Sequence, residues 1–228
     1  VRVRSDLTFS TQIDMVVESG GRMAGWALRT FRRRGRGLMP TILRSLIQPR
    51  LDYCSQLWSP QDQSSINRLE SVQRQFISQI RDHSLVGMNY WEKLSHLRVY
   101  SQERRRERYQ ICFLWKQSQG LISGYEFDWQ WSDRRGRLAV PKRIPRDAPS
   151  RVKKAREMSL GVHGAQIFNL LPKSLRNENC GDFDLFKNHL DIFLAMIPDQ
   201  PTSSGLARAA KSNSMLDQVP LVQNLNLD

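Results

Sequence analysis

The stretch that decides the fold is DQSSINRLESVQRQFISQI, residues 62–80. Its apolar residues recur every three or four positions, which is the spacing of one face of an α-helix. They are Ile66, Leu69, Val72, Phe76, Ile77 and Ile80. The opposite face carries Arg68 and Arg74, with Arg81 just beyond. The pattern therefore predicts an amphipathic helix with one face in a core formed by other helices.

Similar periodicity on both sides of this stretch predicts further helices. Upstream, one begins near Ser10 or Thr11, where Thr11 and Asp14 have the spacing of a capping box, and ends in an arginine cluster followed by Gly35 and Gly37. Another covers residues 38–47 and is expected to end at Pro49. Downstream, helices are expected at 90–97 and, after Ser101 as N-cap, up to about residue 117. Residues 1–118 thus read as a helical domain.

The composition changes after residue 118. Residues 119–158 combine glycines, prolines and a dense basic run, which predicts a basic irregular linker with room for a short hairpin. Helical periodicity returns at 162–171 and 183–197, so residues 159–198 form a C-terminal helical segment. The polar residues 199–228 are expected to be a disordered tail. The fold class is mainly α: a helical bundle, a basic irregular linker and a small C-terminal helical unit.

The charge balance indicates the kind of partner. Lys and Arg number 35 against 22 Asp and Glu, which gives a formal net charge of +13. Such a surplus favours a polyanion, usually nucleic acid, although an inert basic surface remains the alternative. The three widely spaced cysteines make no disulfide framework, which suits the nucleus or cytoplasm. No apolar run approaches the roughly 20 residues that span a bilayer, so no membrane partner is expected.

Two basic groups are candidates for binding phosphate, because arginine binds phosphate bidentately and clustered cations release counterions. The first group is Arg29, Arg32, Arg33, Arg34 and Arg36; its alternative is a solvated helix end. The second is Arg134, Arg135, Arg137, Lys142, Arg143, Lys153 and Lys154. Trp129 and Trp131 precede the second group and could stack on unpaired bases, or else pack the linker onto the helices. A nuclear-localisation role for this run remains open.

Other conspicuous residues are expected to be structural. Leu51, Tyr53, Leu57 and Trp58 should form core around the turn after Pro49, and the same is expected of Trp26, Phe76, Trp115 and Phe168. The arginines of residues 104–108 alternate with Glu103 and Glu107, so a self-neutralised helix is as good an interpretation as phosphate binding. The four histidines and three cysteines lack zinc-site spacing, and no metal site is expected.

The order of these segments resembles the C-terminal part of reverse transcriptases from non-LTR (LINE-type) retrotransposons. The most specific stretch is LIQPRLDYCSQLWSP, residues 46–60. DLTFSTQI (6–13) and LRTFRRR (28–34) precede it, and INRLESVQRQF (66–76) and LSHLRVYSQERRRERY (94–109) follow. IFNLLPKSLRN (167–177) and FDLFKNHLDIFLAMIPDQP (183–201) look like that family's terminal region.

The resemblance implies the thumb and the segments after it, which hold the primer–template duplex of RNA and DNA. The family's RNA-directed DNA polymerase chemistry needs palm aspartates that bind two Mg²⁺ ions. This sequence has no adjacent pair of aspartates, and Asp52 beside Tyr53 is interpreted as structural. We therefore expect a fragment that binds the phosphate backbone without sequence preference, and expect no catalysis, catalytic residue, cofactor or small-molecule substrate in this chain.

Three alternatives remain at this stage. One is a DNA-binding module with a helix-turn-helix-like pair at 38–47 and 62–80, although the turn between them is long and apolar for that motif. Another is a protein-interaction scaffold whose basic surface is incidental. The last is a retroelement relic without a function of its own.

Overall fold

The computed structural model describes residues 1–6, 8–122, 129–133, 137–177, 182–201 and 213–218. The chain is mainly helical, as the sequence predicted, with one small two-stranded hairpin in the described residues. Its contacts divide it into two compact units, Val1–Arg105 and Arg106–Asp228. The expected boundary at residue 118 therefore lies within the second unit, because only the start of helix α7 (Gln102–Ser118) belongs to the first.

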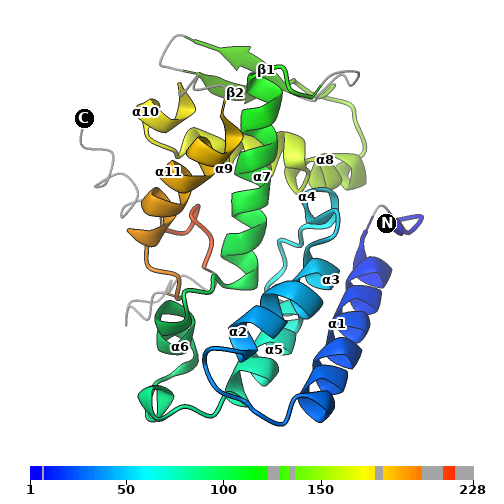
Figure 1. Cartoon of the computed structure of the whole chain (residues 1–228). Helices are drawn as coiled ribbons and strands as arrows, with labels where there is room; N and C mark the ends of the chain where they lie inside the picture. Colours follow the sequence, from blue (N-terminus) through cyan, green and yellow to red (C-terminus); the bar gives the residue numbers. More distant parts are fainter. Residues whose placement is uncertain (7, 123–128, 134–136, 178–181, 202–212, 219–228) are drawn as a thin grey trace, which may run out of the picture. The chain divides into compact units, whose positions relative to one another are not determined.

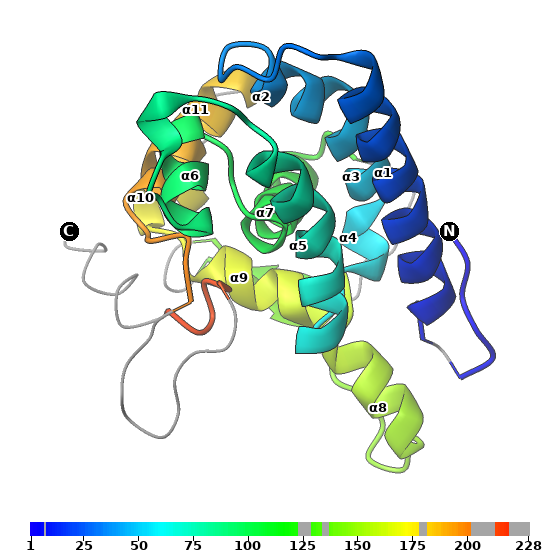
Figure 2. The ribbon, with the colours of Figure 1, turned by 90° about the horizontal axis from the view of Figure 1, so that it is seen from below.

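The first unit is built from helices that follow one another closely. In chain order they are α1 (Ser10–Thr30), α2 (Met39–Ile42), a π-helical turn (Leu43–Ile47), α3 (Gln48–Asp52), α4 (Ser55–Trp58), α5 (Gln63–Ser78), a 3-10 turn (His83–Leu85) and α6 (Tyr90–Leu97). Helix α1 lies alongside α5 and also contacts α3 and the π-helical turn (Figures 1 and 2). The helix predicted over 62–80 is confirmed as α5, with the Asp62 side chain accepting from Ser65 N at 2.8 Å as its N-cap.

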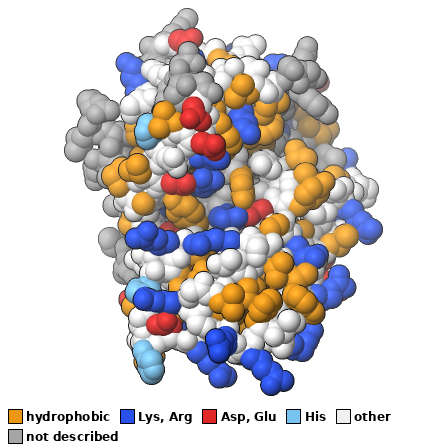
Figure 3. Space-filling view, viewed as in Figure 1, with side chains coloured by type: hydrophobic (Ala, Val, Ile, Leu, Met, Phe, Trp, Pro, Cys, Tyr) orange, Lys and Arg blue, Asp and Glu red, His pale blue; other side chains and the backbone are white. Residues whose placement is uncertain are grey.

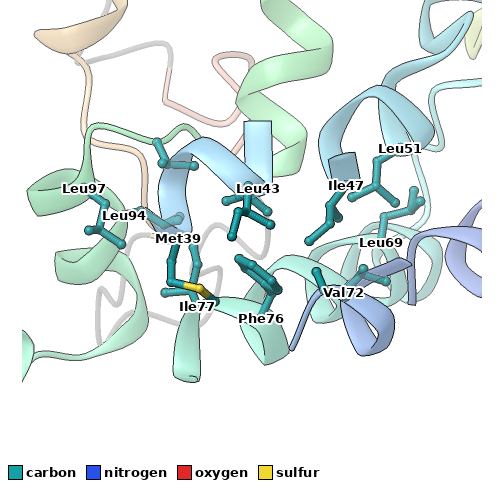
Figure 4. Close-up of a cluster of buried hydrophobic side chains, with 14 of the residues drawn as sticks. Met39, Leu43, Ile47, Leu51, Leu69, Val72, Phe76, Ile77, Leu94 and Leu97 are labelled. Atoms are coloured by element: carbon teal, nitrogen blue, oxygen red, sulfur yellow. The ribbon is translucent and has the colours of Figure 1, made fainter. Parts of the chain in front are cut away.

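The core of the first unit forms between α5 and the segment from α2 to α3 (Figure 4). Met39, Leu43, Ile47 and Leu51 contribute from that segment; Leu69, Val72, Phe76 and Ile77 contribute from α5; Leu94 and Leu97 come from α6. Phe76 and Trp58 have no exposed surface, as expected of them. Burying such rings is the largest single apolar contribution that a side chain makes.

Helix α1 differs from the sequence-based expectation at both ends. The predicted capping box is wrong: Phe9 occupies the N-cap without a side-chain hydrogen bond, and Asp14 instead pairs with Arg68 at 2.5 Å. The helix ends at Thr30, before most of the arginine cluster, and Phe31 is extended. Continuing the helix would place the like charges of this cluster one turn apart, which disfavours it.

Pro49 does not end its helix, contrary to the prediction. The chain stays helical from Met39 to Asp52, with the π-helical turn Leu43–Ile47 just before the proline. Proline has no N–H, and its ring would clash with the carbonyl four residues earlier in a regular α-helix. A wider turn at that point separates these groups, as π-bulges do.

The second unit contains the rest of α7 and the elements that follow. They are β1 (Trp129–Ser132), β2 (Leu138–Pro141), α8 (Ser150–Glu157), a π-helical turn (Leu160–Gly164), α9 (Ala165–Asn169), α10 (Lys173–Arg176) and α11 (Phe183–Ala195). The expected linker, residues 119–158, thus includes an antiparallel hairpin and the unpredicted helix α8, which begins directly after Pro149. The side chain of Asn169 holds β2 through two bonds, accepting from Ala139 N at 2.9 Å and donating to the Ala139 carbonyl at 2.8 Å.

The core of the second unit forms where α7 meets α11. The Trp115 ring stacks on Phe186 with centroids 4.5 Å apart, and Trp115 and Phe168 are fully buried, as expected. Part of the expected tail is also placed: Met215 is fully buried, and Glu107 accepts from Ser214 Oγ at 2.7 Å and Met215 N at 2.9 Å. Residues 202–212 and 219–228 lie outside the described residues.

Two adjacent glycines in α1 provide a matched test of this packing. A Cβ at Gly20 would lie 2.7 Å from Cδ2 of the buried Leu51, whereas a Cβ at Gly21 would meet no atom within 4 Å. Alanine improves helix propensity by about 1 kcal/mol at either site, so Gly21→Ala should stabilise the protein by roughly that amount. Gly20→Ala should destabilise it by about 1 kcal/mol despite the same gain, since overpacking a core costs more.

The midpoint of denaturant unfolding, measured for both variants against wild type, checks this prediction. Equal shifts for the two substitutions would contradict the close approach of α1 to α3.

Candidate nucleic-acid interface

Exposed cations gather at one end of the first unit, which we call the arginine-rich end. It consists of Arg29, Arg32, Arg33, Arg34, Arg36 and Arg81. All are exposed except Arg34, which is partly buried. Lys and Arg side chains are prominent in this region, at the lower margin of the view, below α1, α2 and α5 (Figure 3). From Ser19 to Leu51 the sequence contains eight arginines and no acidic residue, so the positive charge here is not offset locally.

Arg34 gives the arginine-rich end its shape. Its guanidinium donates to Gln79 Oε1 at 2.9 Å and to the Leu28 carbonyl at 3.2 Å. Its own carbonyl accepts from Arg81 N at 2.7 Å. These bonds connect the C-terminal ends of α1 and α5, which is why Arg81, 45 residues or more from the first cluster, joins it. Sequence reasoning placed Arg81 only on the polar face of its helix.

Arg36 has an acidic neighbour in Asp82. Its Nε lies 3.6 Å from Asp82 Oδ2, and its Nη1 lies 3.3 Å from Nε2 of His96. Hydrogen bonds from the Ser84 hydroxyl and backbone N–H, with a smaller effect of Arg36, lower the pKa of Asp82. This carboxylate therefore stays ionised near neutral pH. An exposed pair of this kind is weak and screened by salt, so a phosphate group can compete for Arg36.

Arg29, Arg32 and Arg33 are the best placed to meet phosphate. Each is exposed, and within the described part of the chain no ion pair is found for any of the three. Several guanidinium groups with this freedom can adjust to successive phosphates of a backbone.

The second predicted basic group is only partly described. Arg134 and Arg135 lie outside the described residues. Arg137 is partly buried, with its backbone N–H donating to Asn177 Oδ1 at 2.8 Å, so it is integrated into the second unit. Lys142, Arg143 and Lys154 are exposed, whereas Lys153 donates to the Arg146 carbonyl at 2.7 Å.

Helix α8 carries two members of this second group, Lys153 and Lys154, and has no buried residue. It extends away from α9 into solvent in Figure 2. Eight residues without an apolar face contribute little to a core, so α8 presents its charges to solvent. Two side chains of α8 hydrogen-bond to the segment before it. Lys153 donates to the Arg146 carbonyl, and Arg156 donates to the Lys142 carbonyl.

The two tryptophans proposed for base stacking are packed within the second unit instead. Trp129 is 6% exposed and its Nε1 donates to Gln117 Oε1 at 3.2 Å. Trp131 also donates to Gln117 Oε1 and meets Phe168 edge-on, with centroids 5.5 Å apart. The hairpin packs both rings against the second unit, Trp129 buried and Trp131 partly buried. Their packing role, the alternative interpretation, fits the contacts.

Trp26 is exposed, although the sequence predicts it in the core. Its exposed fraction is 46%. The inward face of α1 is formed by small or branched residues such as Val16, Gly20, Ala24 and Ala27, which let α1 approach its neighbours closely. Trp26 lies two positions from Ala24, about 200° round the helix, and therefore faces outward. Tyr53 and Leu57 are also exposed, at 68% and 59%, because the left-handed Cys54 turns the chain between α3 and α4.

The arginines of α7 are engaged internally rather than displayed. Arg105 donates to Asp52 Oδ2 from Nε at 3.0 Å and from Nη2 at 2.5 Å, a contact that fits the structural interpretation of Asp52. Arg108 binds Asp191 through both oxygens, at 2.6 and 2.7 Å. Arg104 and Arg106 are buried. These acidic partners of Arg105 and Arg108 come from other elements, in addition to the glutamates of the same helix that the sequence offered.

Other side chains that could carry chemistry are accounted for by packing. His163 is buried with its Nδ1 3.3 Å from Gln110 Oε1, and burial lowers its pKa to about 4. Burial likewise raises the pKa of the Cys112 thiol to about 11, which leaves it unreactive near neutral pH. Within the described ranges, no three His, Cys, Asp or Glu side chains gather so as to hold a metal ion.

Comparisons with protein-family models, with curated proteins and with solved structures find no match to this chain. The described residues also contain no helix long and apolar enough to cross a bilayer. What the chain does must therefore be argued from its charges and contacts.

Proposed function

We propose that the first unit binds the sugar–phosphate backbone of a nucleic-acid duplex, without sequence preference, through the arginine-rich end. One observation carries the proposal: Arg29, Arg32 and Arg33 project into solvent from a region that has no acidic residue between Ser19 and Leu51. Clustered, mobile cations are the group that binds phosphates by counterion release. Arg34 fixes the loop that carries Arg32 and Arg33 against the end of α1, where Arg29 lies, so the binding surface is formed before the ligand arrives.

The role that fits this surface best is that of the thumb of a non-LTR retrotransposon reverse transcriptase. The segments that resemble that family run through both units in the family's order, and the thumb's task is to hold a primer–template duplex. In the second unit, helix α8 with Lys154 and its basic neighbours would bind RNA or DNA through the same kind of phosphate contact. Polymerisation would need palm aspartates and Mg²⁺, for which this sequence offers no paired carboxylates.

A salt titration with a fluorescein-labelled 20-base-pair RNA–DNA hybrid tests the proposal. If about four phosphates are contacted, affinity should fall about 100-fold between 50 and 200 mM KCl, and a hybrid of scrambled sequence should behave identically. Fluorescence anisotropy provides the dissociation constants. A protein-interaction scaffold would instead show no binding at 50 mM KCl, and a sequence-specific module would discriminate between the two hybrids; either result would refute the proposal.

A further inference from the structure

We infer that Trp26 is a stacking platform for an unpaired base, so that the ligand preferred by this surface is a junction of duplex with single strand. The inference rests on the proposed function and deepens it. Trp58 and Trp115 are fully buried and Trp129 nearly so, whereas Trp26 leaves almost half of its surface exposed. A ring of this size in water is unfavourable unless something covers it, and exposed large apolar groups commonly mark binding sites.

The surroundings of Trp26 indicate which partner covers it. Arg22 and Arg29 lie four residues before and three residues after it, which places all three on one face of α1. The helix rise separates the two arginines by about 10 Å along the axis. The Arg29 side chain folds back along α1 toward the turn that carries Trp26, since a Cβ added at Gly25 would lie 3.4 Å from Nη1 of Arg29. An aromatic ring flanked along the helix by arginines is complementary to a nucleotide, which has an aromatic base and an anionic phosphate. Arg22 pairs with Glu18 at 3.0 Å, but both side chains are exposed, so a phosphate can compete for this arginine.

Phe31 holds the ring in place. The two rings meet edge to face, with centroids 6.2 Å apart and an interplanar angle of 86°. Phe31 is itself partly buried against the core of the first unit, so it acts as a fixed support. A ring with one preset orientation loses less entropy when a base stacks on it.

The pairing state of the ligand follows from the geometry of stacking. In a continuous duplex both faces of each base are covered by neighbouring base pairs, so Trp26 cannot reach them. An unpaired base or a frayed end presents a bare face. Next to Arg29, Arg32 and Arg33, which would hold the duplex backbone, Trp26 therefore selects substrates in which a strand leaves the duplex.

The test compares three ligands: a blunt 20-base-pair RNA–DNA hybrid, the same hybrid with a five-nucleotide overhang, and a ten-nucleotide single-stranded RNA. Wild-type protein should bind the overhang hybrid about tenfold more tightly than the blunt one. Trp26→Ala should remove that advantage and change blunt-hybrid affinity less than about twofold, while Trp26→Phe should keep most of it. Tyr53→Ala, which removes another exposed aromatic of the same unit, is the matched control and should change neither.

Fluorescence supplies an independent readout of stacking. Titration with the single-stranded RNA should quench part of the wild-type tryptophan emission, and this quenching should disappear in Trp26→Phe. Unchanged unfolding midpoints would exclude loss of fold in the variants. If blunt and overhang hybrids bind equally and Trp26→Ala alters neither, the stacking inference is overturned while backbone binding stands. If no ligand binds, the proposed function itself fails.

Discussion

Changing Arg29, Arg32 and Arg33 together to alanine should lower affinity for an RNA–DNA hybrid about 100-fold at 100 mM salt. Each phosphate contact of this kind contributes on the order of 1 kcal/mol, and 1.4 kcal/mol is a factor of ten. The salt dependence should weaken as well, since three lost contacts reduce the slope of log K against log salt by about 2.7. Exposed side chains can be truncated with little effect on stability, so the variant should unfold at the wild-type midpoint.

The matched control is a second triple variant with the same change in net charge. Arg50, Arg68 and Arg74 are exposed arginines of the same unit, with Ser19, Asp14 and Tyr90 as their respective neighbours. Their joint replacement by alanine should cost less than about threefold in affinity. Equal losses in the two triples would mean that net charge alone attracts the ligand and that the arginine-rich end is not the site.

Local patterns in the sequence predicted most of the helices, although not α8, and did not predict which of their faces meet. The 62–80 periodicity gave α5 because every third or fourth residue contacts one core, a property of the helix alone. The positions of Trp26, Trp129 and Trp131 depend on partners elsewhere: α1 packs on its glycine and alanine face, and the hairpin packs through its tryptophans. The aromatic residues therefore indicated that a core exists, but the sequence alone did not show which of them are buried in it.

The effect of a proline on helix structure depends on its position, and a proline does not always end a helix. At Pro49 a π-helical turn absorbs the missing N–H, and Pro149 precedes α8, where a residue without a donor is harmless. The arginines from residue 104 to 108 likewise show that spacing along a helix does not predict every ion pair. Arg105 pairs with Asp52 and Arg108 with Asp191, 53 and 83 residues away, so no spacing within the helix could have revealed their partners.

A buried polar network around Glu70 supports the helices that carry the arginine-rich end. The Glu70 carboxylate accepts from the Tyr90 hydroxyl and, at 2.8 Å, from the backbone N–H of Gln102 at the start of α7. Gln73, one turn further along α5, accepts from Gln102 Nε2 at 2.6 Å and donates to the Tyr100 carbonyl at 3.0 Å. Burial first, and then the charge of Glu70, raise the pKa of Tyr90, so its hydroxyl remains a donor.

Replacing Glu70 with alanine should destabilise the first unit by about 3–5 kcal/mol. The residue is only 4% exposed, so its loss leaves a buried backbone N–H and a buried hydroxyl without their acceptor, and also leaves a cavity. Glu70→Gln keeps one acceptor oxygen and should cost about 1–3 kcal/mol. Tyr90→Phe removes one hydroxyl, which donates to Glu70 and accepts from Gln73 Nε2 at 3.3 Å, and should cost about 1 kcal/mol. Denaturant unfolding of the three variants measures these differences.

The order of the three values distinguishes a network from a well-packed pocket. If cavity formation alone lowered the free energy of unfolding, Glu70→Gln, which nearly preserves volume, would be as stable as wild type. A loss of stability that increases with the number of lost hydrogen bonds requires the network instead. Glu70 also lies away from Arg29, Arg32 and Arg33 in the sequence and, being buried, cannot contact a ligand. Folded Glu70→Gln protein should therefore bind the hybrid with wild-type affinity. A large loss of affinity in fully folded protein would contradict this prediction. It would mean that the position of the arginine-rich end depends on more of α5 than the hydrogen bonds of Arg34 to Gln79 and Arg81.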